Sequence, residues 1–195
     1  MAAGRPREFD MDEALDQALH VFWKKGYEGA SMPDLTAAMG INRPSIYGAF
    51  GNKEELFRKA LDRYMQKSAV FTEETLNEPT ARASIERFLR GVIDKSVCPD
   101  SPRGCLLVQG ALVCGEESET VRRELISCRA RSEERLQKRF ERAKQEGDLK
   151  ADSNPAQMAR FYSAVLQGMA VQTASGAGRE ELEQIVEMAL AAWPE

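Results

Sequence analysis

The chain has 195 residues, of which 43% are hydrophobic and 30% charged, so it is long and apolar enough to bury a real core. Its formal net charge of −4 argues against a general nucleic-acid coat protein, which needs a broadly basic surface, but leaves room for a local DNA-binding face. No secretory signal and no run of about 18 apolar residues is found. We therefore expect a cytoplasmic protein with no membrane partner.

The metal-ligating residues are few and scattered. The single histidine is His20, and the four cysteines, which include no Cys-x-x-Cys pair, are Cys98, Cys105, Cys114 and Cys128. This pattern does not favour a zinc site, and we expect no metal or other cofactor. Cys105 is a possible sensor thiol, because it lies near Arg103 at a predicted helix N-terminus. The alternative is that it is an ordinary small core residue.

Apolar residues recur at helical spacing along most of the chain, which predicts an all-α fold of about nine helices. Gly26 is expected to end the first helix, and Ser31 and Ser118 to cap the second and the seventh. Asn52 and Glu55 are expected to form an N-cap and N3 pair at the start of the fourth helix. In chain order the predicted helices span residues 11–25, 31–39, 43–50, 53–76, 81–97, 105–114, 118–147, 155–175 and 180–192. We place a domain boundary inside the fourth helix, which separates an N-terminal domain (1–60) from a C-terminal domain (61–195).

Residues 31–50 form a helix-turn-helix pattern, in which two short helices flank a tight turn at Gly40. In such a unit the second helix enters the major groove of DNA. Arg43 can then reach guanine O6 and N7, while Pro44 can contact a thymine methyl. Ser45 can contact a base or a phosphate, and Tyr47 a phosphate.

Three further groups can contact DNA beside this helix. Ser31 and Lys53 lie at helix N-termini, where backbone N–H groups favour phosphate. Arg5 and Arg7 form a basic arm that either reaches the minor groove or is an ordinary frayed terminus. Residues 1–60 hold 8 Lys/Arg against 9 Asp/Glu, a difference of −1, so the position of the bases matters more than their number. The predicted DNA-binding residues are Arg5, Arg7, Ser31, Arg43, Pro44, Ser45, Tyr47 and Lys53.

Residues 26–57, GYEGASMPDLTAAMGINRPSIYGAFGNKEELF, resemble the DNA-binding signature of the TetR family of bacterial transcriptional regulators. The resemblance rests on spaced identities at Gly26-Tyr27, Ser31, Leu35, Ala38, Gly40, Tyr47, Phe50, Lys53 and Leu56-Phe57. It implies that Tyr47 and Lys53 bind phosphates and that residues 43–49 read bases. The chain departs from the family pattern at Thr36, Met39, Pro44 and Ala49, so the resemblance does not imply an operator sequence. An Arg-Gly-Cys-Leu stretch at 103–106 resembles a subgroup that includes electrophile and oxidant sensors.

The C-terminal domain is predicted to pair subunits and bind a ligand. Wide apolar stripes on the last two helices suggest a four-helix bundle shared by two copies, an interface that the resemblance also implies. Its predicted residues are Tyr162, Val165, Met169, Leu182, Ile185, Val186, Ala189 and Trp193. The middle helices are predicted to enclose an effector, although each of these positions is also consistent with plain core. The candidate lining residues are Tyr64, Phe88, Val92, Leu107, Gln109, Phe161, Tyr162 and Met169.

These patterns predict a homodimeric repressor that leaves a palindromic double-stranded operator when a small molecule binds. One alternative is a thiol-based repressor that senses electrophiles or oxidants. Two alternatives come from other classes. A thiol enzyme is disfavoured because no histidine lies near a cysteine in the sequence. A helical interaction module without DNA binding would keep its activity after Arg43→Ala with Tyr47→Ala, whereas a repressor would not.

Overall fold

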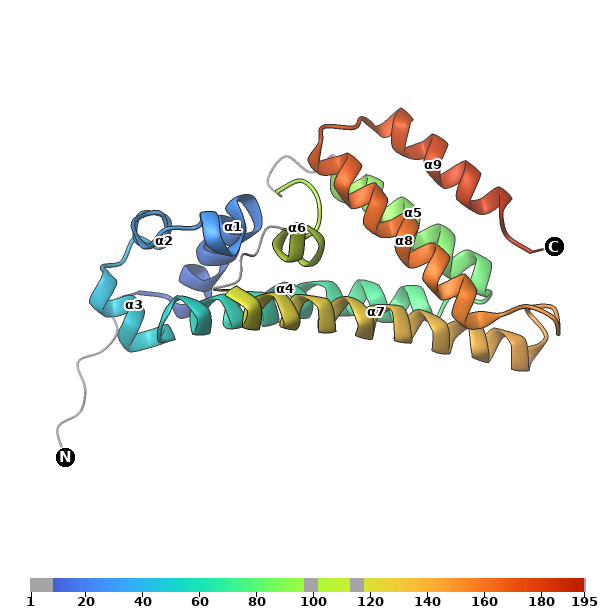
Figure 1. The fold of residues 1–195 in the computed structure, drawn as a ribbon, viewed down its shortest axis with the longest axis horizontal. Helices are drawn as coiled ribbons and strands as arrows, with labels where there is room; N and C mark the ends of the chain where they lie inside the picture. The colour runs from blue at the N-terminus through green and yellow to red at the C-terminus, as the bar shows by residue number, and fades with distance from the viewer. Residues whose placement is uncertain (1–8, 97–101, 113–117, 195) are drawn as a thin grey trace. The chain divides into compact units, whose positions relative to one another are not determined.

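The computed structural model describes residues 9–96, 102–112 and 118–194, and every regular element in these ranges is an α-helix (Figure 1). The helices are α1 (Met11–Gly29), α2 (Met32–Met39), α3 (Arg43–Phe50), α4 (Lys53–Leu76), α5 (Ala81–Ser96), α6 (Leu106–Leu112), α7 (Glu119–Glu146), α8 (Pro155–Ala174) and α9 (Arg179–Ala191). The all-α prediction with about nine helices is confirmed. None of the helices in the described ranges is long and apolar enough to cross a membrane.

The chain divides into two compact units, an N-terminal unit of Met1–Lys67 and a C-terminal unit of Ser68–Glu195. The division falls within α4, so this one helix contributes residues to both units. The predicted boundary near residue 60 also lies in this helix. The assignment of separate roles to residues 1–60 and 61–195 stays a prediction.

Two local predictions about helix ends differ from the structure. The backbone leaves helical geometry at Gly26 (φ 73°, ψ 174°), where the first helix was expected to end, but a further short helical segment continues to Gly29. Ser118 precedes α7 without a capping hydrogen bond from its side chain. Its backbone (φ −110°, ψ 23°) lies outside the extended region that N-cap residues usually adopt, so the hydroxyl is not placed over the first turn.

The N-terminal unit is built around aromatic side chains from α1, α3 and α4. Phe22, Phe50 and Phe57 are fully buried, and the rings of Phe22 and Phe57 meet edge to face with centroids 5.1 Å apart. At the rim, Asp16 accepts a hydrogen bond from Arg63 Nε at 3.0 Å and pairs with Lys67 Nζ at 2.7 Å. The hydrogen bond from Arg63 lowers the pKa of Asp16, so this carboxylate joins α1 to α4 in its charged form.

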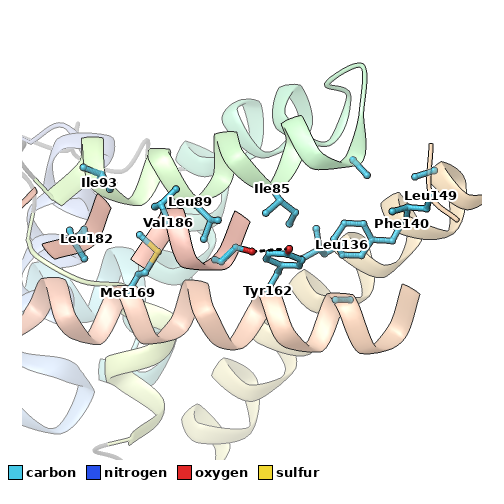
Figure 2. Packing of buried hydrophobic residues seen from close by; sticks show 14 residues of the cluster. Ile85, Leu89, Ile93, Leu136, Phe140, Leu149, Tyr162, Met169, Leu182 and Val186 are labelled. Carbon is cyan, nitrogen blue, oxygen red and sulfur yellow. Dashed lines mark hydrogen bonds between the residues drawn. The ribbon is translucent and has the colours of Figure 1, made fainter. Parts of the chain in front are cut away.

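The C-terminal unit has one apolar core in which α8 packs against α5, α7 and α9 (Figure 2). Tyr162 of α8 is fully buried at its centre and donates its hydroxyl hydrogen to the Ala189 carbonyl of α9 at 3.1 Å. Burial raises the pKa of Tyr162 to about 12. The phenol therefore stays neutral and its polar atom is satisfied within the subunit.

A buried arginine holds the start of α5. The side chain of Arg139 in α7 is 2% exposed, and it donates from Nε to Ser84 Oγ at 3.2 Å and from Nη2 to the Glu78 carbonyl at 3.1 Å. Asp148 Oδ2 lies 3.9 Å from Arg139 Nη2 and accepts the Ala81 N–H at 2.6 Å. Desolvation lowers the pKa of Arg139, and Asp148 is the nearest opposing charge. The carboxylate thus caps α5 and compensates a buried cation at once.

We predict that Asp148→Ala lowers the free energy of unfolding by about 2–3 kcal/mol, because it removes the acceptor of the Ala81 N–H and leaves the Arg139 charge without its carboxylate. Urea denaturation followed by circular dichroism measures the loss. The double variant Asp148→Ala with Arg139→Met removes the buried charge too, so it should be destabilised by less than the sum of the two single changes. Simple additivity would show that the two charges do not interact.

Candidate DNA-binding interface

The turn between α2 and α3 is set by Gly40, whose φ of 66° lies in the left-handed region that favours glycine. Before it, Ser31 and Asp34 form a capping box at the start of α2. The Asp34 N–H donates to Ser31 Oγ at 3.2 Å, and the Ser31 N–H donates to Asp34 Oδ2 at 3.0 Å. Lys25 Nζ lies 2.6 Å from the same carboxylate, and its hydrogen bond holds the pKa of Asp34 well below its usual range.

This arrangement qualifies the predicted role of Ser31. Its hydroxyl already donates to Asp34 Oδ2 at 2.7 Å, so a phosphate could take this donor only by displacing the carboxylate. The predicted cap is present, while a direct phosphate contact from the hydroxyl stays a prediction.

The helix α3 has a buried side and an exposed side. Ile46 and Phe50 are 0% and 1% exposed and anchor the helix in the core of the N-terminal unit. Asn42 caps the helix by accepting the Ser45 N–H at 2.9 Å, a local signal that sequence reasoning missed. The opposite side presents the predicted base-reading residues, with Ser45 partly buried at its edge and Arg43, Pro44 and Tyr47 exposed.

On this exposed side, Arg43 and Tyr47 contact each other. Arg43 Nη2 donates to the Tyr47 hydroxyl at 3.0 Å, and the guanidinium carbon lies 5.4 Å from the centre of the Tyr47 ring. Gly48 follows, and a Cβ placed on it would meet nothing within 4 Å. A glycine inside a helix is less stable than an alanine by about 0.5–1 kcal/mol. Packing within the subunit does not require a glycine at position 48, because a side chain there would meet no neighbour. The surface of α3 beside the Arg43–Tyr47 pair therefore carries no side chain at Gly48.

The start of α4 is a second polar position. Asn52 and Glu55 form the predicted N-cap and N3 pair, with the Asn52 N–H donating to Glu55 Oε2 at 2.8 Å and the Glu55 N–H to Asn52 Oδ1 at 2.9 Å. Lys53 Nζ lies 4.5 Å from the centre of the Tyr27 ring. Desolvation lowers the pKa of Lys53, and Glu28 opposes this shift. Tyr27 thus holds the Lys53 ammonium at the N-terminus of α4. Tyr27 was not among the residues assigned to the site from the sequence.

Arg5 and Arg7 lie outside the described residues, so the basic arm stays a prediction. Within the N-terminal unit two acids of α1 have cationic partners, and one of them, Asp16, pairs with Arg63 and Lys67. The Arg63 guanidinium also lies 3.5 Å from Asp12.

The predicted effector-binding residues do not form one group. Tyr162 and Met169 are fully buried core residues, and Phe88 and Val92 pack against the same core. Leu107 is buried and Gln109 partly buried in α6, and the Gln109 side chain lies over the backbone of Gly104.

Phe161 is 44% exposed and points out of the core, which contradicts a position inside an enclosed cavity. Tyr64 belongs to the N-terminal unit and meets Trp23 edge to face with ring centroids 4.8 Å apart.

The predicted dimer contacts need a correction. Five of the eight residues, Tyr162, Met169, Leu182, Val186 and Ala189, are at most 4% exposed in a single subunit. A partner cannot reach side chains that α5, α7, α8 and α9 already bury together. Val165, Ile185 and Trp193 are partly buried against the same core. The large apolar residues left exposed on α8 and α9 are instead Phe161, Val171 and Met188.

Two of the four cysteines are described. Cys105 is partly buried directly before α6, and Cys128 is 2% exposed with its sulfur 3.0 Å from Arg131 Nη2. The Lys95 ammonium lies near Cys105. Desolvation lowers the pKa of Lys95, and the charge of a Cys105 thiolate opposes this. Cys98 and Cys114 lie outside the described residues.

Known proteins with this architecture are bacterial regulators. The sequence model described as bacterial regulatory proteins, tetR family, matches residues 14–60, and the tetracyclin repressor-like C-terminal domain matches residues 81–188. The HTH-type transcriptional repressor ComR of Escherichia coli is 33% identical over 98% of this chain and 92% of its own length. The HTH-type transcriptional repressor DhaR of a Mycobacterium species is 25% identical over 88% of this chain and 86% of its own.

Solved structures agree. A cysteine-substituted form of the TetR family transcriptional regulator CifR, complexed with a 26-base-pair double-strand operator DNA, is 44% identical and superposes with a TM-score of 0.95, covering 98% of this chain and 100% of CifR. The two domain models and these relatives extend the similarity to the TetR family from residues 26–57 to nearly the whole chain. The chain therefore belongs to the TetR family of bacterial regulatory proteins.

Proposed function

We propose that this protein is a transcriptional repressor that binds a double-stranded operator as a homodimer and is released by an effector. The observation that carries the proposal is the exposed side of α3, where Arg43, Pro44 and Tyr47 face away from a core that fixes Ile46 and Phe50. The operator complex of CifR, at 44% identity, supports the same use of this helix here. The curated relatives are regulators, which favours this function over a thiol enzyme, and a DNA-binding role implies action in the cytoplasm.

In this proposal the contacts divide by type. Arg43 reads a base edge and Pro44 offers an apolar surface to a thymine methyl. Tyr47, Lys53 and the N-terminus of α4 hold phosphates, which fixes the register of α3 in the groove without reading sequence. Two copies with their α3 helices about 34–36 Å apart would match two half-sites of a palindrome.

The test is selection from a library of random-sequence DNA duplexes with the purified protein. We expect the wild type to enrich a palindromic motif, and Arg43→Ala to bind the enriched duplex about 5- to 150-fold more weakly, the effect of losing one bidentate base contact. Arg90→Ala is the matched control, because Arg90 is an exposed arginine of α5 in the C-terminal unit and its ion pair is with Glu86 on its own helix. Fluorescence anisotropy measures both affinities.

Failure of the wild type to enrich any motif would overturn the repressor proposal. A variant Arg43→Ala that binds as tightly as Arg90→Ala would remove Arg43 from the base-reading role. A motif without two-fold symmetry would instead argue against binding as a symmetric dimer.

The proposed dimer face lies on the exposed sides of α8 and α9. On α8 it comprises Phe161, Ala164, Gly168 and Val171, which recur at helical spacing, and on α9 it includes Met188, which is 74% exposed. A Cβ on Gly168 would meet nothing within 4 Å in the subunit. Small residues beside apolar ones allow two helices to approach closely, as a four-helix bundle formed by two copies requires.

We predict that Gly168→Arg converts the dimer to a monomer without unfolding the subunit. The new side chain would point into space that is empty in the monomer, and arginine is a better helix former than glycine by about 0.8–1 kcal/mol. Sedimentation equilibrium measures the mass and thermal denaturation the fold. Ala130→Arg, at an exposed position of α7, is the control and should remain dimeric. A dimeric Gly168→Arg variant would show that the interface lies elsewhere.

A thiol-based effector response is a second candidate, favoured by the position of Cys105. Cys105 is only partly buried, directly before α6, and it interacts with the Lys95 ammonium. Cys128 has a different environment, since it is buried beside Arg131. The remaining candidate is an effector that binds without covalent reaction.

We predict that N-ethylmaleimide releases the wild type from its selected duplex and that Cys105→Ser resists release. Cys128→Ser, in which the accessible thiol is kept, should respond like the wild type. Electrophoretic mobility shift measures the bound fraction before and after treatment. Equal release of the wild type and Cys105→Ser would exclude Cys105 as the responsive thiol, and retention of all three on DNA would leave the non-covalent effector.

A further inference from the structure

The polar pair on α3 carries one inference beyond the separate contacts assigned to its members. We propose that Tyr47 is a positioning residue for Arg43, and that its hydroxyl holds the guanidinium in the orientation in which it reads a base. This rests on the proposed function, since it concerns how the same helix reads DNA. Tyr47 then affects which sequence is preferred, and not only how tightly the backbone is held.

The geometry shows two contacts between the same side chains. Arg43 Nη2 lies 3.0 Å from the Tyr47 oxygen, within hydrogen-bond range, and the guanidinium carbon lies 5.4 Å from the ring centre, within the range of a cation–π contact. The residues are four apart on one helix and therefore lie on one face. Tyr47 is 42% exposed and Arg43 is exposed too, so the pair stands at the surface that would meet DNA.

The backbone beneath the pair is fixed. Ile46 and Phe50 anchor α3 from the inside, and Asn42 closes its first turn through the Ser45 N–H. Pro44 holds φ near −65° in that first turn. The remaining freedom of Arg43 is that of its long side chain, and Tyr47 restrains it.

Donor accounting shows that the contact leaves both groups able to bind DNA. A guanidinium has five N–H donors, and one is used on Tyr47. Two of the other four suffice for O6 and N7 of a guanine. The Tyr47 oxygen accepts from Arg43, so its own hydrogen is available to a phosphate oxygen. The pair therefore links a backbone contact to a base contact, and part of the rotamer entropy of Arg43 is lost before binding.

The competing interpretation is that Tyr47 binds a phosphate and has no influence on Arg43. The two interpretations differ for Tyr47→Phe. This change keeps the ring and its contact with the guanidinium but removes the oxygen that orients it. A lost phosphate contact would weaken binding to all sequences alike, whereas a lost orientation would weaken the preference at the base that Arg43 reads.

The experiment repeats the selection from random duplexes with four proteins, namely the wild type, Arg43→Ala, Tyr47→Phe and the double variant, and compares base preference at every position. Arg43→Ala should erase a preference at one position of each half-site. We expect Tyr47→Phe to reduce that same preference about 2- to 12-fold, the effect of losing one typical hydrogen bond at an exposed site, and to leave other positions unchanged. In the Arg43→Ala background, Tyr47→Phe should have no further effect on preference at any position. Thermal denaturation checks that every variant is folded.

Three results would overturn the proposal. One is a Tyr47→Phe variant that binds all duplexes more weakly with the wild-type motif intact. Another is an equal effect of Tyr47→Phe with and without Arg43, which would mean that the two side chains act independently. The third is an Arg43→Ala variant that keeps every base preference. If the wild type enriches no motif at all, it is the repressor function itself that fails.

Discussion

Burial of Ile46 and Phe50 fixes which residues of α3 can meet a partner, and the proposed DNA contacts depend on it. A helix of eight residues is too short to be stable alone, so its orientation is decided by the side chains that it buries. With these two anchored, Arg43, Pro44 and Tyr47 must face outward, because residues three and four apart share a face. The left-handed turn at Gly40 and the cap at Asn42 then determine where this face begins.

The net charge of the chain limits how the proposed DNA-binding surface can gain affinity. A chain with a formal charge of −4 gains little from general attraction to phosphates, so a small number of well-placed groups must supply its affinity. In the structure, two basic side chains of this surface are restrained by aromatic rings, which can raise their contribution to affinity without a high density of positive charge. Lys53 is held over Tyr27, and Arg43 is held over Tyr47. Side chains that are ordered before binding lose less entropy when they bind, so each contact contributes more.

The features that the sequence predicted correctly are mostly local. The Ser31 and Asn52 caps involve partners three residues away, so the spacing alone revealed them. The proposed dimer face could not be located from the sequence, because α8 is apolar on more than one side. Phe161 and Tyr162 are neighbours in sequence but lie about 100° apart around the helix, and only the packing of α5, α7 and α9 shows that Tyr162 is the buried one. Arg139 gave no local signal at all, since its partners Ser84 and Glu78 lie 55 and 61 residues away.

In the proposed mechanism, helix α4, which contributes residues to both units, is the element through which an event in the C-terminal unit would reach the proposed DNA contacts. Its first half packs Phe57 and Leu61 into the core of the N-terminal unit, where Arg63 and Lys67 also hold Asp16. In its second half, the Phe71 ring lies close to Gly91 of α5. A Cβ added to Gly91 would lie 2.4 Å from Phe71 Cζ, so with the ring in this position only glycine fits there. The Lys95 ammonium lies 5.2 Å from the centre of the same ring and also interacts with Cys105. The Phe71 ring therefore packs directly against the backbone of α5 at Gly91, where a shift of α5 would first be transmitted to α4. Coupling of only about 1–3 kcal/mol along such a helix would change operator affinity by about 5- to 150-fold, which is sufficient for a repressor to respond.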